Sequence, residues 1–242
     1  MNPDLILSSL SSRLQEAVAF YWQTRNAQSR SQHARGATDQ GSRSAVTGGA
    51  HMDRFLEIIA DYLVQAGVPA SCIHFHRNLE LPGYFRATKE WDLVVVRNNR
   101  LIAALETKSQ VGSFGNNFNN RTEEAMGSAL DLWTAYREGA FLASPTPWLG
   151  YLFLLQDCEA SRRAVRTKEP HFQVFPEFKD ASYARRYELF CRKLVRERHY
   201  LAAAFLLSTS ESGANGHFIE PAPDLGAHQL LRSLLVHASA NS

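Results

Sequence analysis

The sequence predicts a mixed α/β fold in which a central sheet is flanked by helices. Segments whose apolar residues recur at helical spacing alternate with short runs rich in Val and Leu, which are typical of strands. One run, Trp148 to Gln156, is apolar almost throughout, the pattern of a strand covered on both faces. With 242 residues, 45% of them hydrophobic, the chain is expected to form a single domain over residues 1–242.

The first elements are two helices and three strands. Near-helical spacing of apolar residues predicts a helix over residues 5–22. A clean apolar stripe predicts a second helix from Asp53 to Ala66, which Gly67 and Pro69 end. Strands are predicted at residues 73–79, 91–96 and 101–107, the last two joined by a turn at Asn98-Asn99, since Asn tolerates left-handed backbone.

The remaining elements continue the alternation of strands and helices. A loop rich in Gly and Asn is expected from Ser109 to Asn120. The later elements are predicted as a helix at about 122–137, a strand at 148–156, a basic amphipathic helix around 183–195, a strand at 200–207 and a terminal helix at 225–237.

Residues 23–50 differ sharply in composition from their surroundings. Their only apolar residues are Ala and one Val, and one Asp faces four arginines, namely Arg25, Arg30, Arg35 and Arg43. Such a segment cannot bury enough surface to fold alone. Two interpretations stay open: a disordered linker, or a flexible basic arm that becomes ordered on the phosphate backbone of DNA.

The distribution of charge and the cysteines indicate a partner and a compartment. The net charge is only +2, yet residues 162–198 hold 11 Lys and Arg against 5 Asp and Glu, which favours a polyanion such as nucleic acid as partner. Cys72, Cys158 and Cys191 are odd in number and far apart, as expected of free thiols in a reducing compartment. With neither a secretory signal nor a membrane-spanning run expected, the prediction is a cytoplasmic protein.

Three charged residues interrupt two strands that otherwise look buried. Asp92 follows Trp91 in one strand, while Glu106 and Lys108 end the next strand on one of its faces. Two carboxylates from adjacent strands suit Mg²⁺, and a nearby lysine can orient or help deprotonate a water and offset charge. The pattern predicts hydrolysis of a phosphodiester, although most such matches are ordinary surface strand ends.

The pattern also makes a geometric prediction. A strict two-residue turn at Asn98-Asn99 would pair Asp92 with Leu105 and leave Asp92 and Glu106 on opposite faces. A three-residue loop, a β-bulge or an irregular start to the Asp92 strand is therefore expected.

The run from Lys89 to Ala129 resembles a type II restriction endonuclease of the XhoI family, within the PD-(D/E)xK nuclease superfamily. Its motifs are KEWDLVVV and LETKSQVGSFGNNFNNRTEEAMGSA, with looser likeness in YWQTR and SAVTGGAHMD. In this resemblance Asp92 and Glu106 match the two metal-binding acids and Lys108 the catalytic lysine. Glu90 and Trp91 precede Asp92, so the proline of the motif is absent.

The resemblance implies Mg²⁺-dependent double-strand cleavage of DNA at a palindrome, with CTCGAG as the expected site, by a homodimer that leaves 5′-phosphates. It also implies a companion DNA methyltransferase in the same restriction-modification system. The alternatives are a repair or structure-selective nuclease with the same core, and a DNA-binding module whose acids are structural.

Other residues carry weaker predictions. The loop after the catalytic strand offers groups able to bond phosphates or base edges, namely Gln110, Asn116, Asn117, Asn119, Asn120 and Arg121. Whether Glu57 or Glu123 joins the metal site is left open, since the first lies opposite the apolar stripe and the second suits a helix start. His74 and His76 lack a third ligand, so a partly exposed strand face is the better interpretation.

Overall fold

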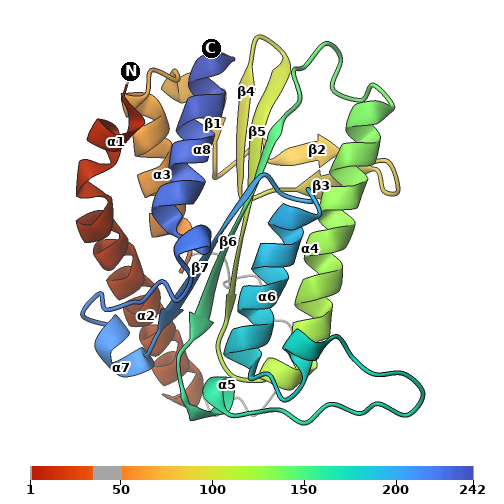
Figure 1. The fold of residues 1–242 in the computed structure, drawn as a ribbon. Helices are drawn as coiled ribbons and strands as arrows, with labels where there is room; N and C mark the ends of the chain where they lie inside the picture. The colour runs from red at the N-terminus through yellow and green to blue at the C-terminus, as the bar shows by residue number, and fades with distance from the viewer. Residues whose placement is uncertain (1, 35–50, 242) are drawn as a thin grey trace.

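A computed structural model describes residues 2–34 and 51–241 and contains a central five-stranded sheet (Figure 1). The strands are β1 (Ile73–His74), β2 (Glu80–Pro82), β3 (Thr88–Glu90), β4 (Leu93–Arg97), β5 (Arg100–Gln110), β6 (Trp148–Gln156) and β7 (Ala202–Ser208). The helices are α1 (Pro3–Ile6), α2 (Leu10–Ala34), α3 (Asp53–Gln65), α4 (Phe114–Arg137), α5 (Glu159–Arg162), α6 (Tyr183–Arg196), α7 (Ser210–Gly213) and α8 (Ala227–Ala240).

The sheet is mixed, in the order β1-β4-β5-β6-β7. β1, β4 and β5 pair antiparallel, whereas β5, β6 and β7 pair parallel through the crossover helices α4 and α6. β2 and β3 form a separate two-stranded hairpin beside α4. The predicted fold class is confirmed.

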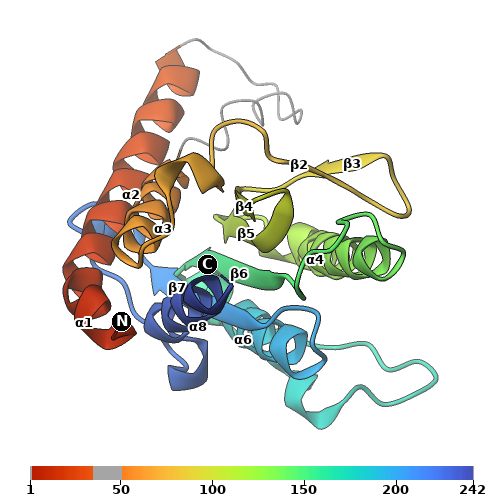
Figure 2. The same cartoon turned by 90° about the horizontal axis from the view of Figure 1, so that it is seen from above.

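Helices cover both faces of the sheet (Figure 2). On one face α2, α3 and α8 bury a core that includes Leu93 and Leu105; on the other, α4 and α6 bury a core that includes Val94 and Ala104. Successive residues of β4 and β5 point to opposite faces of the sheet, so each side chain packs into one of the two cores. In the described part of the chain, no helix is long and apolar enough to cross a membrane.

The first predicted helix ends later than expected. α2 continues to Ala34, so residues 23–34 of the predicted arm are helical, while residues 35–50 lie outside the described part. Helix formation is cooperative once a nucleus exists, and α2 is already anchored on the core by Leu14, Val18 and Tyr21, so polar residues can extend it.

Two further predictions of local structure were wrong. The strand predicted at 73–79 ends at His74, because the chain bends away from the sheet edge and Asn78 adopts left-handed backbone with φ 59°. The loop predicted at Ser109–Asn120 is mostly helix, since β5 runs to Gln110 and α4 begins at Phe114. Phe114 and Phe118 lie four residues apart and pack on the core, and this packing outweighs the weak helix propensity of the asparagines.

Candidate active site

The β4–β5 ladder brings the two predicted acids to one face of the sheet. The ladder ends at the pair Leu93–Leu105, and just beyond it the Asp92 amide donates to the Leu105 carbonyl at 3.2 Å, which brings Asp92 beside Glu106. Both lie on the face covered by α4 and α6: burial raises the pKa of Tyr200, a core residue on that face, and the charges of Glu106 and Asp92 raise it further. Lys108 follows Glu106 on the same face.

A β-bulge resolves the register conflict. Asn98 and Asn99 have φ of 51° and 58°, the left-handed backbone of a two-residue hairpin turn. The ladder then shifts between Val95 and Val96, which pair with Ala103 and Leu101 and leave Ile102 as the extra residue. This shift brings Asp92 beside Glu106 instead of opposite Leu105, and of the three irregularities predicted as alternatives the structure contains the bulge.

Glu106 is buried between two ammonium groups. Its side chain is 6% exposed; Lys108 binds Oε1, and Lys89 binds Oε2 at 2.6 Å. Burial alone would raise the pKa of Glu106, but the charges and hydrogen bonds of Lys108 and Lys89 outweigh it and lower the pKa. Glu106 is therefore held as a carboxylate.

Asp92 is in the opposite electrostatic situation. Burial raises its pKa, and the neighbouring charge of Glu106 raises it further. Its Oδ2 accepts the Thr107 amide at 2.6 Å and the Thr107 hydroxyl at 3.1 Å, which fixes the carboxylate. Among the described residues nothing donates to Oδ1, so this oxygen is available to a cation.

Lys108 is the third member of the group. Burial by itself would lower its pKa, but Glu106 and Asp92 raise it above the ordinary value. Its side chain is 25% exposed, so the ammonium sits at the boundary between the carboxylates and solvent. It can therefore orient a polar ligand and offset negative charge there.

The wall beside this site is aromatic. In the β5–β6 ladder Tyr151 lies next to Glu106 and Phe153 next to Lys108, and Tyr187 of α6 stacks on Phe153 with ring centroids 4.5 Å apart. An apolar wall lowers the local dielectric constant and strengthens every charge interaction within the site.

The donor set suits a hard cation that retains water ligands. Within residues 2–34 and 51–241, no three His, Cys, Asp or Glu side chains gather as a complete metal cage. Two carboxylates from adjacent strands are nevertheless what Mg²⁺ commonly uses, because it keeps several waters and takes further oxygens from a phosphate substrate. Asp92 and Glu106 thus fit Mg²⁺ better than Zn²⁺, which favours closed sets of His and Cys.

Comparison with known proteins identifies the family. The family model described as restriction endonuclease XhoI matches residues 31–220. The chain belongs to the XhoI restriction endonuclease family. It is accordingly a restriction endonuclease, an enzyme of the site-specific deoxyribonuclease class.

Three relatives of the XhoI family show how far the likeness extends. Type II restriction enzyme BstVI of Geobacillus stearothermophilus is 51% identical over 210 residues, which make up 84% of this chain and 94% of BstVI. XhoI of Xanthomonas vasicola is 50% identical over 181 residues, 74% of this chain and 72% of that enzyme. AbrI of Azospirillum brasilense is 47% identical over 171 residues, 70% and 77% of the two chains. No solved structure matches.

The described residues among those predicted to bind DNA lie on three elements, α2, β5 and α4. Gln110 is buried at the end of β5 and donates to the Gly112 carbonyl at 2.7 Å. Asn116, Asn119 and Asn120 are exposed on the first turns of α4, where Asn117 and Arg121 are half-buried. Arg25 lies over the Tyr21 ring at 5.9 Å and Arg30 lies in α2, while Arg35 and Arg43 fall outside the described residues.

Neither additional glutamate reaches the two acids. Glu57 forms an ion pair with Arg54 at 2.8 Å on the outer side of α3. Glu123 is exposed on α4, and its neighbour Glu124 pairs with Arg121 at 2.7 Å. Both positions therefore read as surface charges.

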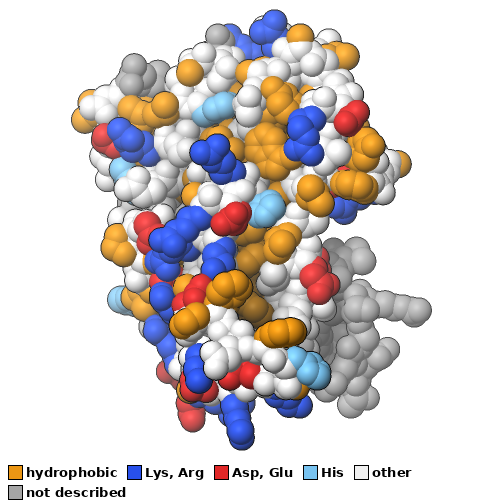
Figure 3. Space-filling view, turned by 45° about the vertical axis from the view of Figure 1, so that its right-hand side comes forward, with side chains coloured by type: hydrophobic (Ala, Val, Ile, Leu, Met, Phe, Trp, Pro, Cys, Tyr) orange, Lys and Arg blue, Asp and Glu red, His pale blue; other side chains and the backbone are white. Residues whose placement is uncertain are grey.

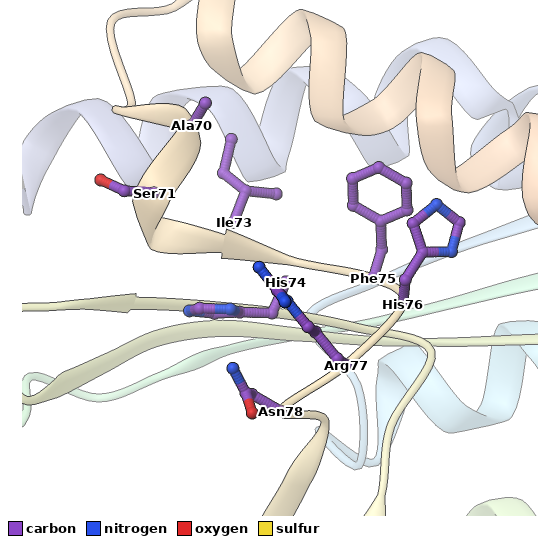
Figure 4. A pocket seen from close by; sticks show the side chains of 8 residues that line it. All are labelled: Ala70, Ser71, Ile73, His74, Phe75, His76, Arg77 and Asn78. Atoms are coloured by element: carbon purple, nitrogen blue, oxygen red, sulfur yellow. The ribbon is translucent and has the colours of Figure 1, made fainter.

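His74 and His76 do not form a metal pair. They line a hollow of about 310 Å³ beside β1, together with residues 70, 71, 73, 75, 77 and 78 (Figure 4). The two imidazoles point in different directions, and the His76 ring rests against Phe75 with centroids 4.3 Å apart. Because β1 ends at His74, His76 lies outside the strand, and the prediction that the two share a strand face was wrong.

Four basic residues of the segment at 162–198 form ion pairs, namely Arg162, Arg185, Arg192 and Lys193. Figure 3 shows Lys and Arg side chains interspersed with Asp and Glu side chains on one side of the molecule. On α6, Arg185 and Arg192 both pair with Glu188, Arg192 also pairs with Asp224, and Lys193 pairs with Glu177. These side chains neutralise one another, which reduces their availability for a DNA backbone.

Sequence reasoning missed two residues of the site. Thr107 holds Asp92, and Lys89 holds Glu106 from the neighbouring hairpin. The signal for Lys89 was its place three residues before Asp92, in the middle of a short strand, β3, that the sequence did not predict. Without β2 and β3, the position of its side chain could not be inferred.

Proposed function

We propose that this restriction endonuclease makes Mg²⁺-dependent double-strand cuts in DNA at a palindromic site, expected to be CTCGAG, and leaves 5′-phosphates. The observation that carries the proposal is the convergence of Asp92, Glu106 and Lys108 on one face of the β4–β5 hairpin. The names of the relatives support the substrate, since each is a type II restriction enzyme.

Each residue has a defined role in this proposal. Asp92 and Glu106 hold Mg²⁺, which when bound polarises the scissile phosphate and acidifies a water. Thr107 keeps the Asp92 carboxylate facing the site through its amide and hydroxyl. Lys108, as an ammonium, orients the attacking water and offsets the charge that accumulates on the phosphate.

The proposed assembly is a homodimer. A palindromic site has two-fold symmetry, and a two-fold symmetric dimer places one active site at each strand. We further propose that the enzyme works in the cytoplasm beside a methyltransferase that protects the host's own DNA. Arg25, Arg30, Arg35 and Arg43, with the polar side chains at the start of α4, are proposed to contact DNA.

Replacing Asp92 by Ala tests the central role directly. We expect cleavage to fall by at least about a hundredfold because a metal ligand is lost, while DNA binding is retained. The measurement is digestion of DNA of known sequence in Mg²⁺ and in EDTA, with binding followed by gel shift.

The same digest separates the alternatives. Discrete fragments ending at one palindrome support the proposal, whereas a smear indicates a repair or structure-selective nuclease. Full cleavage by the Asp92→Ala variant would assign the acids a structural role and refute the proposal.

A further inference from the structure

Lys89 is a second lysine in the active site. It reaches Glu106 from β3 with a 2.6 Å ion pair, and its side chain is only 12% exposed. The ammonium also donates to the Glu90 carbonyl at 2.8 Å and lies 4.3 Å from the centre of the Trp91 ring. Glu106, the Glu90 carbonyl and the Trp91 ring therefore hold the Lys89 ammonium in place, whereas a surface lysine moves freely.

The two lysines on Glu106 are not equivalent. Lys108 stands on the same strand two residues further on, and Glu106 is its ion-pair partner among the described residues. Lys89 approaches the other carboxylate oxygen from a separate hairpin and has the Glu90 carbonyl and the Trp91 ring as further partners. If Glu106 is to offer an oxygen to a metal, Lys89 can release its oxygen at lower cost, because a carbonyl and a π face continue to stabilise its charge.

We propose that Lys89 is the displaceable counter-ion of Glu106: a divalent cation takes Oε2 from Lys89, whose ammonium then remains on the Glu90 carbonyl and the Trp91 ring. This inference rests on the proposed metal-binding role of Asp92 and Glu106. Lys89 is thus a positioning residue that neutralises and orients Glu106 until metal binds. Metal and ammonium compete for one oxygen, so the lysine sets how much metal the enzyme requires.

Because the metal and Lys89 compete for one oxygen of Glu106, removal of the lysine charge is predicted to strengthen metal binding. Lys89→Met keeps the length and the apolar stem over Trp91 but removes the competing charge. We expect the full-length, DNA-free protein to bind Mn²⁺ about three- to tenfold more tightly, measured from the free-ion EPR signal, because an ion pair that opposes metal binding is lost. The Mg²⁺ concentration for half-maximal DNA cleavage is expected to fall in the same proportion.

Two variants serve as controls. Lys89→Arg keeps the positive charge and can bind Glu106 in a bidentate manner, so it is expected to bind Mn²⁺ no more tightly than the wild type. Lys179→Met makes the same change of net charge at an exposed position outside the site and is expected to leave Mn²⁺ affinity within about twofold. Should Lys89→Met fail to fold by circular dichroism, Lys89→Gln removes the charge while keeping a polar end.

The outcomes distinguish this inference from the proposed function. Tighter Mn²⁺ binding by the uncharged variant supports displacement, provided that Lys89→Arg binds no more tightly than the wild type and Lys179→Met stays within about twofold of it. A folded Lys89→Met or Lys89→Gln protein that binds Mn²⁺ as the wild type does, or more weakly, overturns it and leaves the metal site intact. If the wild type itself binds no Mn²⁺, the metal-dependent function fails and this inference with it.

Discussion

At the residue scale, the site contains two neighbouring carboxyl groups whose surroundings shift their pKa values in opposite directions. Glu106 has an ammonium on each oxygen and a lowered pKa, whereas Asp92 has a raised pKa because of burial and the charge of Glu106. Paired carboxyl groups whose environments push their pKa values apart are typical of catalytic sites. A bound cation would therefore stabilise the Asp92 carboxylate more than the Glu106 carboxylate.

Asp92→Asn is expected to raise thermal stability in EDTA at pH 7, by roughly 2–4 °C. A group with a raised folded pKa stabilises the protein below its ordinary pKa and loses that contribution as pH rises through the folded pKa. Asn cannot ionise and still accepts the Thr107 hydrogen bonds, so its advantage should grow with pH and shrink toward pH 4. The measurement is a series of melting curves between pH 4 and pH 8.

The same melts repeated in Mg²⁺ supply the control. Mg²⁺ should raise the melting temperature of the wild type but not that of Asp92→Asn, since a metal ligand is missing. A variant that melts below the wild type in EDTA at pH 7 would show that Asp92 is not under electrostatic strain.

At the element scale, the β2–β3 hairpin links α4 to the candidate active site. Its turn is attached to the buried Asp131 of α4, whose Oδ1 accepts the amides of Tyr84 and Phe85 at 2.8 Å each and whose Oδ2 accepts Arg86 Nε at 2.7 Å. The hairpin then leads through Lys89 to Asp92. A carboxylate of α4 thus helps to hold the strand that delivers Lys89.

Asp131→Ala is expected to cost about 2 kcal/mol of unfolding free energy, because two amides and a guanidinium lose a charged acceptor. The melting temperature should fall by roughly 4–8 °C. Asp131→Asn retains an acceptor for the amides and should lose less. Asp61→Ala breaks an exposed ion pair with Arg13 and should cost no more than about 0.5 kcal/mol; equal losses at positions 61 and 131 would contradict the assigned role.

At the scale of the whole molecule, two groups of basic residues differ in their surroundings. The basic residues of α6 are mostly committed to ion pairs, whereas the arginines of residues 23–50 face a single acid in the sequence. Phosphate contacts release counterions from DNA, so they are recognised by the salt dependence of binding. This property separates arginines that bind DNA from those that stabilise the fold.

Replacing Arg30, Arg35 and Arg43 together by Gln is expected to weaken DNA binding and lower the slope of log affinity against log salt by up to about 3, one for each lost phosphate contact. The measurement is DNA binding across a salt series. A matched variant with Gln at Arg185, Arg192 and Lys193 removes the same charge from side chains that are held in ion pairs and should leave the slope nearly unchanged. Identical slopes for the two triple variants would show that the basic arm does not contact the DNA backbone.

Most elements of the fold could be predicted because their apolar periodicity coincides with their burial. The stripe of α3 and the continuous apolar run of β6 needed no tertiary information. The start of α4 and the end of β1 were misjudged, because Phe114 and Phe118 act through the core and Asn78 through a backbone turn. Local composition does not record such contacts.

The sequence by itself determined the mixed α/β class and the family, and residue order and spacing made the acids at 92 and 106 and the lysine at 108 the proposed site residues. Only the tertiary structure decided that the extra residue at Ile102 turns Asp92 toward Glu106, and that Lys89 arrives from a separate hairpin to occupy the second oxygen of Glu106. The physical reason is that register and ion pairing depend on which strands meet, and strand pairing is set by packing of the whole domain rather than by any short stretch of chain.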